Sequence, residues 1–352
     1  MSRIGRFLTA TVRAALLSVA TAGTIAVATP ASAQQTGAAT IDAIRARGAL
    51  VCGVNTGLAG FAQPDSQGVW RGFDIDYCQA VAIALFNDRS KVRFVPLTAQ
   101  TRFTALQSGE VDILARNITW TLSRDTALGL DFAAINFFDG QGFMVRRSAG
   151  VNHARELEGA TICVQPGSTT EQNLGDWARA NNIRFTPLVI ERLEDNVAAY
   201  LAGRCDAFTT DVSGLAATRA AQANPEEHVI LPEVISKEPL GPSVRHGDQR
   251  FTDLVRWVHF GLVVAEELNI TSANVAQAVT GDARPEAQRL LGRTGELGAM
   301  LGVDNAWMVN IIRAVGNYGE IYARNLAPIG LQRGPNALWT TPGGLMYAPP
   351  FR

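Results

Sequence analysis

Apolar and polar positions follow the same order in two separate stretches of the chain. Residues 102–119 and 196–213 each predict a helix, a glycine, an aspartate three residues later, a short apolar strand and a polar strand end. Glycine fits the position after a helix, where a positive φ is needed. Asn117 and Asp211 stand at the two polar ends, each five residues after its aspartate. Because ligands of open α/β sheets bind at the carboxyl ends of strands, we expect both units to face one ligand.

The same patterns predict further strands and helices, and their alternation indicates an α/β fold. Short apolar runs between turn residues predict strands at 50–55, 92–96, 111–115, 137–147, 161–165 and 229–235. Amphipathic or capped stretches predict helices at 41–47, 73–86, 101–108, 212–223, 251–268, 285–291 and 306–325. Asp74 is expected to cap the helix at 73–86, and Ser168 with Glu171 is expected to form a capping box at the start of another helix.

A guanidinium follows the strand predicted at 111–115. Asn117 and Thr119 come directly after this strand, and Arg124 closes the segment. The planar fork of an arginine matches a carboxylate with two parallel hydrogen bonds, which a lysine cannot form. Asp211 supplies an anion from the other unit, so an α-amino acid would fit between Arg124 and Asp211. Taken by itself, the segment is equally consistent with a surface turn that carries an ordinary arginine.

Hydroxyl groups stand at the start of the helix that follows the strand at 161–165. A helix start with free N–H groups and the side chains of Ser168, Thr169 and Thr170 is suited to bind an anion. Structural capping is the alternative. The glycines and lysine of a phosphate loop are missing, and without a G-x-S-x-G motif a nucleophilic Ser168 is not expected.

Residues 1–33 have the pattern of a secretory signal peptide. Two arginines precede a run of small apolar residues, and an A-x-A cleavage motif ends the segment at residue 33. Removal of its three arginines changes the formal net charge from −1 to −4, which argues against a nucleic-acid partner. With 47% hydrophobic and 18% charged residues, the remainder can form full cores, and its length suggests two domains.

Four cysteines in an exported chain suggest two disulfides, for which three pairings exist. Cys52 and Cys78 fall in the first unit, and Cys163 and Cys205 fall in the second. We expect each pair to bond within its own unit, because a bridge between the units would prevent their relative motion. No C-x-x-C motif is present and the four histidines show no ligand spacing, so no metal site is expected.

Several motifs resemble the periplasmic solute-binding proteins of polar amino-acid ABC transporters. The similar segments are G-F-D-I-D-Y at 72–77, residues 102–114, S-R-D-T at 123–126, D-G-Q-G-F-M-V at 139–145 and residues 203–211. A narrower resemblance, to the general L-amino-acid-binding members, rests on residues 238–248, V-G-N-Y-G-E at 315–320 and the ending G-G-L-M-Y-A-P-P-F-R.

This resemblance implies a two-lobe periplasmic binding protein of type II with two crossing hinge strands and a C-terminal helical extension. Lobe one would comprise residues 34–143 plus 236–352, and lobe two would comprise 144–235. The first crossing is expected at 137–147 and the second at 229–235.

The resemblance also implies roles for individual residues. Arg124 would bind the α-carboxylate, with Asn117 and Thr119 nearby and the helix start at Thr169 and Thr170 assisting, and Asp211 would bind the α-ammonium. Further candidate ligand contacts lie in the first half of the chain: Asn55, Leu58, Phe61 and Arg102. Leu58 stands where related narrow binders place an aromatic residue, which favours broad recognition. Arg102 would favour acidic side chains if it faces the cleft, and is otherwise a solvated helix residue.

The function implied is a non-catalytic, monomeric periplasmic receptor without a cofactor. It would deliver L-amino acids with polar, acidic, amide or aliphatic side chains to the permease subunits of an ABC importer in the inner membrane. A periplasmic enzyme on the same fold, such as a cyclohexadienyl dehydratase, is the alternative. The sequence shows no further acid–base pair beside the expected ligand groups, which weighs against that enzyme. A receptor's sensor module is a weaker third possibility.

Overall fold

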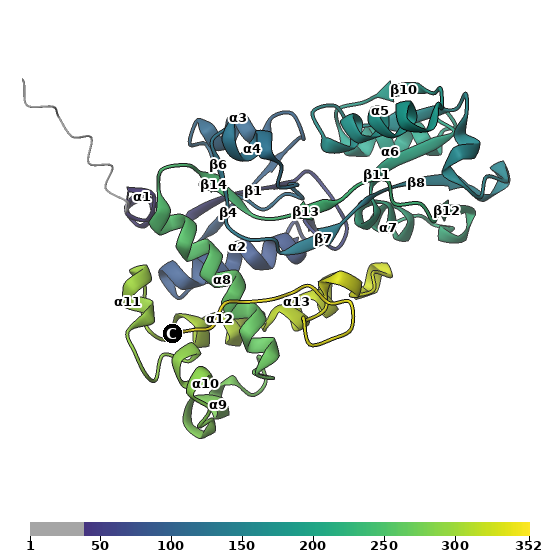
Figure 1. The fold of residues 1–352 in the computed structure, drawn as a ribbon. Helices are drawn as coiled ribbons and strands as arrows, with labels where there is room; N and C mark the ends of the chain where they lie inside the picture. The colour runs from purple at the N-terminus through teal and green to yellow at the C-terminus, as the bar shows by residue number, and fades with distance from the viewer. Residues whose placement is uncertain (1–38) are drawn as a thin grey trace, which may run out of the picture. The chain divides into compact units, whose positions relative to one another are not determined.

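Two five-stranded sheets organise the computed structural model, which describes residues 39–352 (Figure 1). The first sheet has the order β4–β1–β5–β14–β6, and the second has the order β10–β9–β11–β8–β12. The predicted α/β fold with two lobes is thereby confirmed. The predicted signal peptide lies outside the described residues, and the lobe boundaries at 143/144 and 235/236 stay predictions.

The first sheet is parallel at its centre. Its strands are β1 (Leu50–Asn55), β4 (Val92–Leu97), β5 (Ile113–Leu114), β6 (Leu130–Phe132) and β14 (Ser243–Arg245). β1 is buried along its whole length and pairs in parallel with β4 and β5, and β14 is antiparallel to β5 and β6. The same part of the chain contains α1 (Ala39–Arg47), the hairpin β2 (Gln63–Pro64) and β3 (Trp70–Arg71), α2 (Phe73–Phe86), α3 (Arg102–Gln107) and α4 (Leu122–Thr126). Because β1 and β5 run in the same direction, the residues after both strands emerge at one edge of the sheet.

The second sheet has the same arrangement, in which one antiparallel strand lies between parallel ones. Its strands are β8 (Gln141–Arg146), β9 (Thr161–Val164), β10 (Thr186–Val189), β11 (Ala207–Asp211) and β12 (His228–Ile230). β9 is parallel to β10 and β11, whereas β8 is antiparallel to β11 and β12. The helices of this lobe are α5 (Thr169–Asn181), α6 (Leu193–Leu201), α7 (Val212–Ala220), η1 (Arg147–Ala149), η2 (Ala154–Leu157) and η3 (Pro225–Glu227).

Two short antiparallel strands connect the sheets. The chain leaves the first sheet through β7 (Phe137–Asp139) and returns to it through β13 (Glu238–Leu240). The prediction of the second crossing at 229–235 is wrong, because β12 at that place pairs with β8 inside the second sheet. Gly140 links β7 to β8 where the two chain passages approach closely: a Cβ at this position would lie 2.9 Å from the carbonyl oxygen of Ser236.

Both predicted disulfides are present in the structure. Cys52 bonds to Cys78 and ties β1 to α2, with 6.3 Å between the Cα atoms. Cys163 bonds to Cys205 and ties β9 to the turn before β11, with 5.7 Å between the Cα atoms. Each bridge lies beside one sheet, so neither restrains motion of one sheet relative to the other.

Two predicted caps differ in the structure. Helix α2 begins at Phe73 with Gly72 as its N-cap, so Asp74 sits inside the first turn, buried, and makes no capping hydrogen bond. Ser168 does cap α5 and accepts from the Glu171 N–H. The Glu171 carboxylate, however, accepts from the N–H of Gly167, which has a positive φ, and the reciprocal half of the box is not formed.

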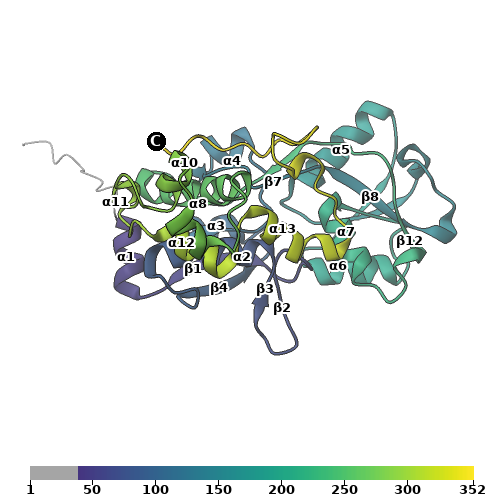
Figure 2. The same ribbon diagram turned by 90° about the horizontal axis from the view of Figure 1, so that it is seen from below.

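A helical C-terminal extension follows the first sheet, as predicted. Its elements are α8 (Gln249–Glu267), α9 (Val275–Gly281), α10 (Pro285–Leu290), α11 (Leu297–Leu301), α12 (Trp307–Val315), α13 (Tyr318–Asn325), η4 (Ala327–Ile329) and η5 (Gly334–Asn336). The single helix predicted at 306–325 is instead two helices, because Gly316 has a φ of 83° and Asn317 with Glu320 forms a capping box that starts α13. Helices α8, α12 and α13 contact α2, as Figure 2 shows for the latter two.

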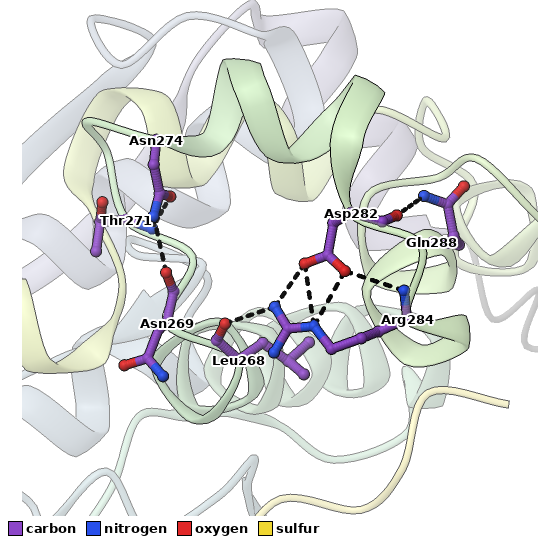
Figure 3. A network of polar contacts seen from close by, with 7 residues as sticks. All are labelled: Leu268, Asn269, Thr271, Asn274, Asp282, Arg284 and Gln288. Atoms are coloured by element: carbon purple, nitrogen blue, oxygen red, sulfur yellow. Dashed lines mark hydrogen bonds and ion pairs between the residues drawn. The ribbon is translucent and has the colours of Figure 1, made fainter.

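A polar network connects α9 and α10 to the end of α8 (Figure 3). The Arg284 guanidinium pairs with Asp282 and donates 2.7 Å to the carbonyl oxygen of Leu268. The Asn274 side chain donates 2.9 Å to the carbonyl oxygen of Asn269. These contacts satisfy carbonyl groups at a helix end, which otherwise lack partners.

The extension also reaches the hinge. The Asn336 side chain accepts 2.7 Å from the Phe138 N–H of β7 and donates 3.0 Å to the Phe138 carbonyl oxygen. The Tyr318 hydroxyl donates 3.0 Å to the carbonyl oxygen of Asn136. Within residues 39–352 no helix is long and apolar enough to cross a membrane, and no cluster of three or more metal-ligating side chains occurs.

Candidate functional site

A small cavity lies between the edges of the two sheets. It contains about 50 Å³ of space, which is room for roughly three to five water molecules. Most of the predicted ligand residues line its wall: Asn55, Leu58, Arg102, Asn117, Thr119, Ser168, Thr169, Thr170 and Asp211. Asn55 ends β1, and the next four follow strands of the first sheet. The other four follow β9 or end β11.

The backbone after β5 turns sharply to bring its polar groups to the cavity. Asn117 has a φ of 48°, a left-handed conformation that asparagine tolerates better than most residues. Thr119 then forms a bridge with Leu240 of β13, which holds the segment against the hinge. Arg124 lies on α4, capped by the Thr121 hydroxyl.

Arg124 lies behind this segment and is absent from the cavity wall. It is 6% exposed, and its guanidinium donates 2.9 Å to the carbonyl oxygen of Thr119. Burial lowers the pKa of Arg124, and the nearby carboxylates of Glu238 and Asp211 oppose that shift. Through its hydrogen bond the guanidinium lies next to Thr119, which lines the cavity.

Phe61 lies elsewhere. It is buried in an aromatic cluster, with ring centroids 5.5 Å from Phe137 and 6.1 Å from Phe73, and it is not on the cavity wall. Its position in the core shows that the loop after β1 presents Leu58 rather than Phe61 to the cavity.

Two buried arginines face the cavity. Arg102 is 3% exposed and Arg116, which was not predicted from the sequence, is 4% exposed. Burial lowers the pKa of Arg102, with the charges of Arg116 and Arg124 adding to the effect. Burial also lowers the pKa of Arg116 to about 10, against the influence of Asp74 and Asp211. Arg102 is therefore a cleft residue and not a solvated helix residue.

Asp211 is the carboxylate of the cavity wall. It ends β11 and precedes α7, and no hydrogen bond from another described side chain reaches it. Burial raises its pKa, with the charges of Asp139 and Glu238 adding to the effect, and Arg102 and Arg124 partly compensate. A cation in the cavity would favour the ionised form of this group.

Glu238, a second residue that was not predicted from the sequence, joins the two sides of the cleft. It lies on β13, is 1% exposed, and accepts 3.0 Å from the Thr169 hydroxyl and also from the Thr119 hydroxyl. Its other carboxylate oxygen accepts 2.6 Å each from Asn173 and Ser236. The carboxylate therefore holds groups from both lobes and from the hinge.

These contacts change the predicted role of the hydroxyl groups. A hydroxyl has a single proton, and Thr119 and Thr169 both donate theirs to Glu238. Ser168 donates to the Gln165 carbonyl oxygen, and Thr170 lies 2.7 Å from the Ser168 hydroxyl. The hydroxyls thus offer lone pairs to the cavity, and a ligand carboxylate has to find its donors among backbone N–H groups and guanidiniums.

Unpaired buried polar atoms concentrate on the cavity wall. Four of the buried side-chain atoms without a partner in residues 39–352 belong to it: Arg102 Nε, Arg116 Nη2, Asn117 Oδ1 and Ser213 Oγ. A buried polar atom without a partner costs about 1–3 kcal/mol, and most such atoms in proteins are satisfied. Their concentration here indicates a site that is completed by a polar ligand.

Two lobes joined by two hinge strands, with a polar cavity between them, define a two-lobe solute receptor. The chain belongs to the bacterial extracellular solute-binding proteins, family 3, whose family model matches residues 50–269. The glutamate/glutamine/aspartate/asparagine-binding protein BztA of Rhodobacter capsulatus is 56% identical over 318 residues, which cover 90% of this chain and 94% of that protein. The general L-amino acid-binding periplasmic protein AapJ of Rhizobium johnstonii is 52% identical over 320 residues, covering 90% of this chain and 93% of AapJ.

A solved structure shows the same architecture. The periplasmic binding protein of an ABC transporter from Brucella ovis, with glutathione bound, superposes with a TM-score of 0.86 at 56% identity. The match covers 89% of this chain and 99% of that protein. The relatives are binding proteins, and this chain is a binding protein rather than the enzyme considered as the alternative.

Proposed function

We propose that this chain is the periplasmic amino-acid receptor of an ABC importer. One observation carries the proposal: the carboxylate of Asp211, from one lobe, shares a polar cavity with the buried guanidiniums of Arg102 and Arg116, from the other lobe. An α-amino acid carries the complementary charges, an ammonium group for Asp211 and a carboxylate for a guanidinium. The names of BztA and AapJ, which are amino-acid-binding proteins, support the same conclusion.

Within this proposal, Asp211 binds the α-ammonium group. Arg124 binds the α-carboxylate together with backbone N–H groups at Thr119 and at the start of α5, whose first N–H groups have no partner within the helix. Asn55, Leu58 and Asn117 surround the side chain. Because the ligand would be enclosed between the two sheets, the lobes part to admit it and close again around it.

Polar, acidic and amide side chains are the preferred class, and Leu58 leaves room for aliphatic ones. The receptor acts as a monomer in the periplasm, after removal of residues 1–33, and passes its ligand to the permease subunits in the inner membrane. BztA, with its four acidic and amide ligands, supports this preference.

A γ-glutamyl peptide is a second candidate ligand. The Brucella ovis protein binds glutathione in its solved structure, and glutathione carries two carboxylates and one ammonium group. The wall of the cavity carries two guanidiniums and one carboxylate, which is the complementary set. A ligand of that size requires a wider separation of the lobes than glutamate does.

Calorimetric titration of the purified protein tests the proposal. We expect binding of glutamate and glutamine with one site per chain, recovery of the ligand unchanged, and at least tenfold weaker binding of glutarate, which lacks the ammonium group. Glutathione is titrated in parallel to compare the two candidates. Glutarate that binds as tightly as glutamate, or an absence of binding by every amino acid, would contradict the proposal.

A further inference from the structure

We propose that Arg116, together with Arg102, forms a second anionic subsite in the cleft, which binds the side-chain carboxylate or amide oxygen of the ligand. The inference rests on the proposed function and deepens it, because it names the residue that distinguishes acidic and amide ligands from the rest. Arg116 would then be a specificity-determining residue, separate from the groups that bind the α-carboxylate and α-ammonium.

The position of Arg116 is the first observation. It follows β5 directly before Asn117, and its Nε donates 2.9 Å to the carbonyl oxygen of Leu97, which fixes the guanidinium. Its Nη2 is buried without a partner. The residue lines the ligand cavity and also a second cavity of about 10 Å³, which it shares with Asp74. The guanidinium therefore lies at the boundary between the ligand space and the core.

The lack of an ion pair is the second observation. Arg102, Arg116 and Arg124 are each at most 6% exposed, and within residues 39–352 none of them forms a salt bridge. Burial of a charge is costly unless that charge is paired. Three unpaired guanidiniums beside one cavity are explained by a ligand that brings more than one anionic group.

The alternative is a purely structural role, in which Arg116 would be the ion-pair partner of Asp74. Asp74 is buried in the first turn of α2, and its Oδ2 has no hydrogen-bond partner. The two residues share the small cavity, which has room for about one water molecule, but no ion pair joins them. Asp74 thus moderates the buried charge of Arg116 but forms no ion pair with it, and the Nη2 of Arg116 remains without a hydrogen-bond partner.

The charges of the wall indicate the ligand class. The wall contains three charged side chains, namely Arg102, Arg116 and Asp211. The complementary ligand has two anionic groups and one cationic group, as glutamate and aspartate have. An amide side chain retains an oxygen that accepts from a guanidinium, whereas a lysine or arginine side chain would add a third positive charge to the site.

A paired substitution tests the inference. Arg116→Gln alone would leave Asp74 buried beside a neutral group, so the variant to use is Arg116→Gln with Asp74→Asn, which removes both charges together. Glutamate, glutamine and serine are titrated into the wild type and this variant by calorimetry. Arg245→Gln is the control, because Arg245, like Arg116, donates to backbone carbonyl oxygens beside the first sheet but does not line the cavity.

In the double variant we expect the affinity for glutamate to fall at least tenfold more than the affinity for serine, with glutamine between them. In Arg245→Gln the affinities for glutamate and glutamine relative to serine should be unchanged. Equal losses for the three ligands at an unchanged melting temperature would show that Arg116 only supports the fold. Unchanged affinity for glutamate would equally overturn the inference. If the wild type binds none of the three ligands, the proposed function fails instead.

Discussion

Replacement of Asp211 by asparagine tests ligand binding without affecting folding. Asparagine keeps the size of the side chain and removes its charge. No hydrogen bond from another described side chain reaches Asp211, so the lobe does not depend on the carboxylate for its structure. The ligand does depend on it, because Asp211 is the sole carboxylate among the residues that line the described cavity. The substitution should therefore reduce binding and leave folding intact.

The magnitude of the loss follows from burial. An ammonium group that is left in a closed cavity without its partner costs about 2–5 kcal/mol of binding free energy. At about 1.4 kcal/mol for each tenfold change, the dissociation constant should rise roughly 30- to 5,000-fold. The loss should be similar for glutamate, glutamine and leucine, because all three carry the same ammonium group.

The stability of the unliganded protein should change in the opposite direction. Burial, with Asp139 and Glu238, raises the pKa of Asp211 above its ordinary value. The folded state therefore binds this proton more tightly than the unfolded state, and the wild type loses stability as the pH rises above the unfolded pKa of about 3.9. The neutral amide in Asp211→Asn has no such cost, so the empty variant should melt at the same temperature as the wild type or above it.

Proton release gives an independent signature. Because the ligand's ammonium group favours ionised Asp211, binding should release up to one proton in the pH range where the empty protein holds it. Calorimetry in buffers with different ionisation enthalpies measures this number directly, and the release should vanish in Asp211→Asn. Near-wild-type affinity in the folded variant, or uptake of a proton by the wild type at this site, would refute the role of Asp211.

Three further substitutions test other parts of the site. Arg124→Lys keeps the charge but loses the planar fork, and calorimetry should show about 1–3 kcal/mol weaker binding for glutamate, glutamine and leucine alike; a loss confined to glutamate would mean that Arg124 contacts the side chain. Glu238→Ala removes the carboxylate that accepts hydrogen bonds from both lobes. Glutamate should then bind at least tenfold more weakly, and small-angle scattering should show a more open empty protein. Unchanged scattering and affinity would contradict this role of Glu238. Burial raises the pKa of Asp74 to about 7 in the folded protein, against the effect of Arg116. The free energy of unfolding of the wild type, measured in urea relative to Asp74→Asn, should therefore fall by about 3 kcal/mol between pH 4 and pH 7, and parallel pH profiles of the two proteins would show that this shift is absent.

Much of the fold could be predicted because local signals agree with the tertiary structure. The strand at 50–55 and the helix at 73–86 coincide with β1 and α2, since both are predominantly apolar segments that are buried over nearly their whole length. The strand predicted at 229–235 overlaps β12 only at its first two residues and was interpreted wrongly as a crossing, because strand pairing depends on residues far away in the sequence. The break at Gly316 was missed although Asn317 and Glu320 carried a capping-box signal.

Site residues could be predicted where their position relative to a strand end determines whether they reach the cavity. Asn117 follows β5 and Asp211 ends β11 in two similar units, and the structure brings both to one cavity. Arg116 was missed because it directly follows an apolar strand, where a buried charge is not expected without knowledge of the ligand. Glu238 was missed because its partners come from three separate segments. Phe61 was misplaced because the direction of a side chain in a loop is set by tertiary packing and has no sequence period.

A crystal structure of the protein with glutamate bound tests the proposed site most directly. We predict a glutamate enclosed between the lobes, with its ammonium nitrogen within hydrogen-bond distance of Asp211 and its α-carboxylate on Arg124. Its side-chain carboxylate should lie on Arg116 and Arg102. A glutamate bound in the reverse orientation, with the α-carboxylate on Arg116, or one bound outside this cavity, would contradict the assignment.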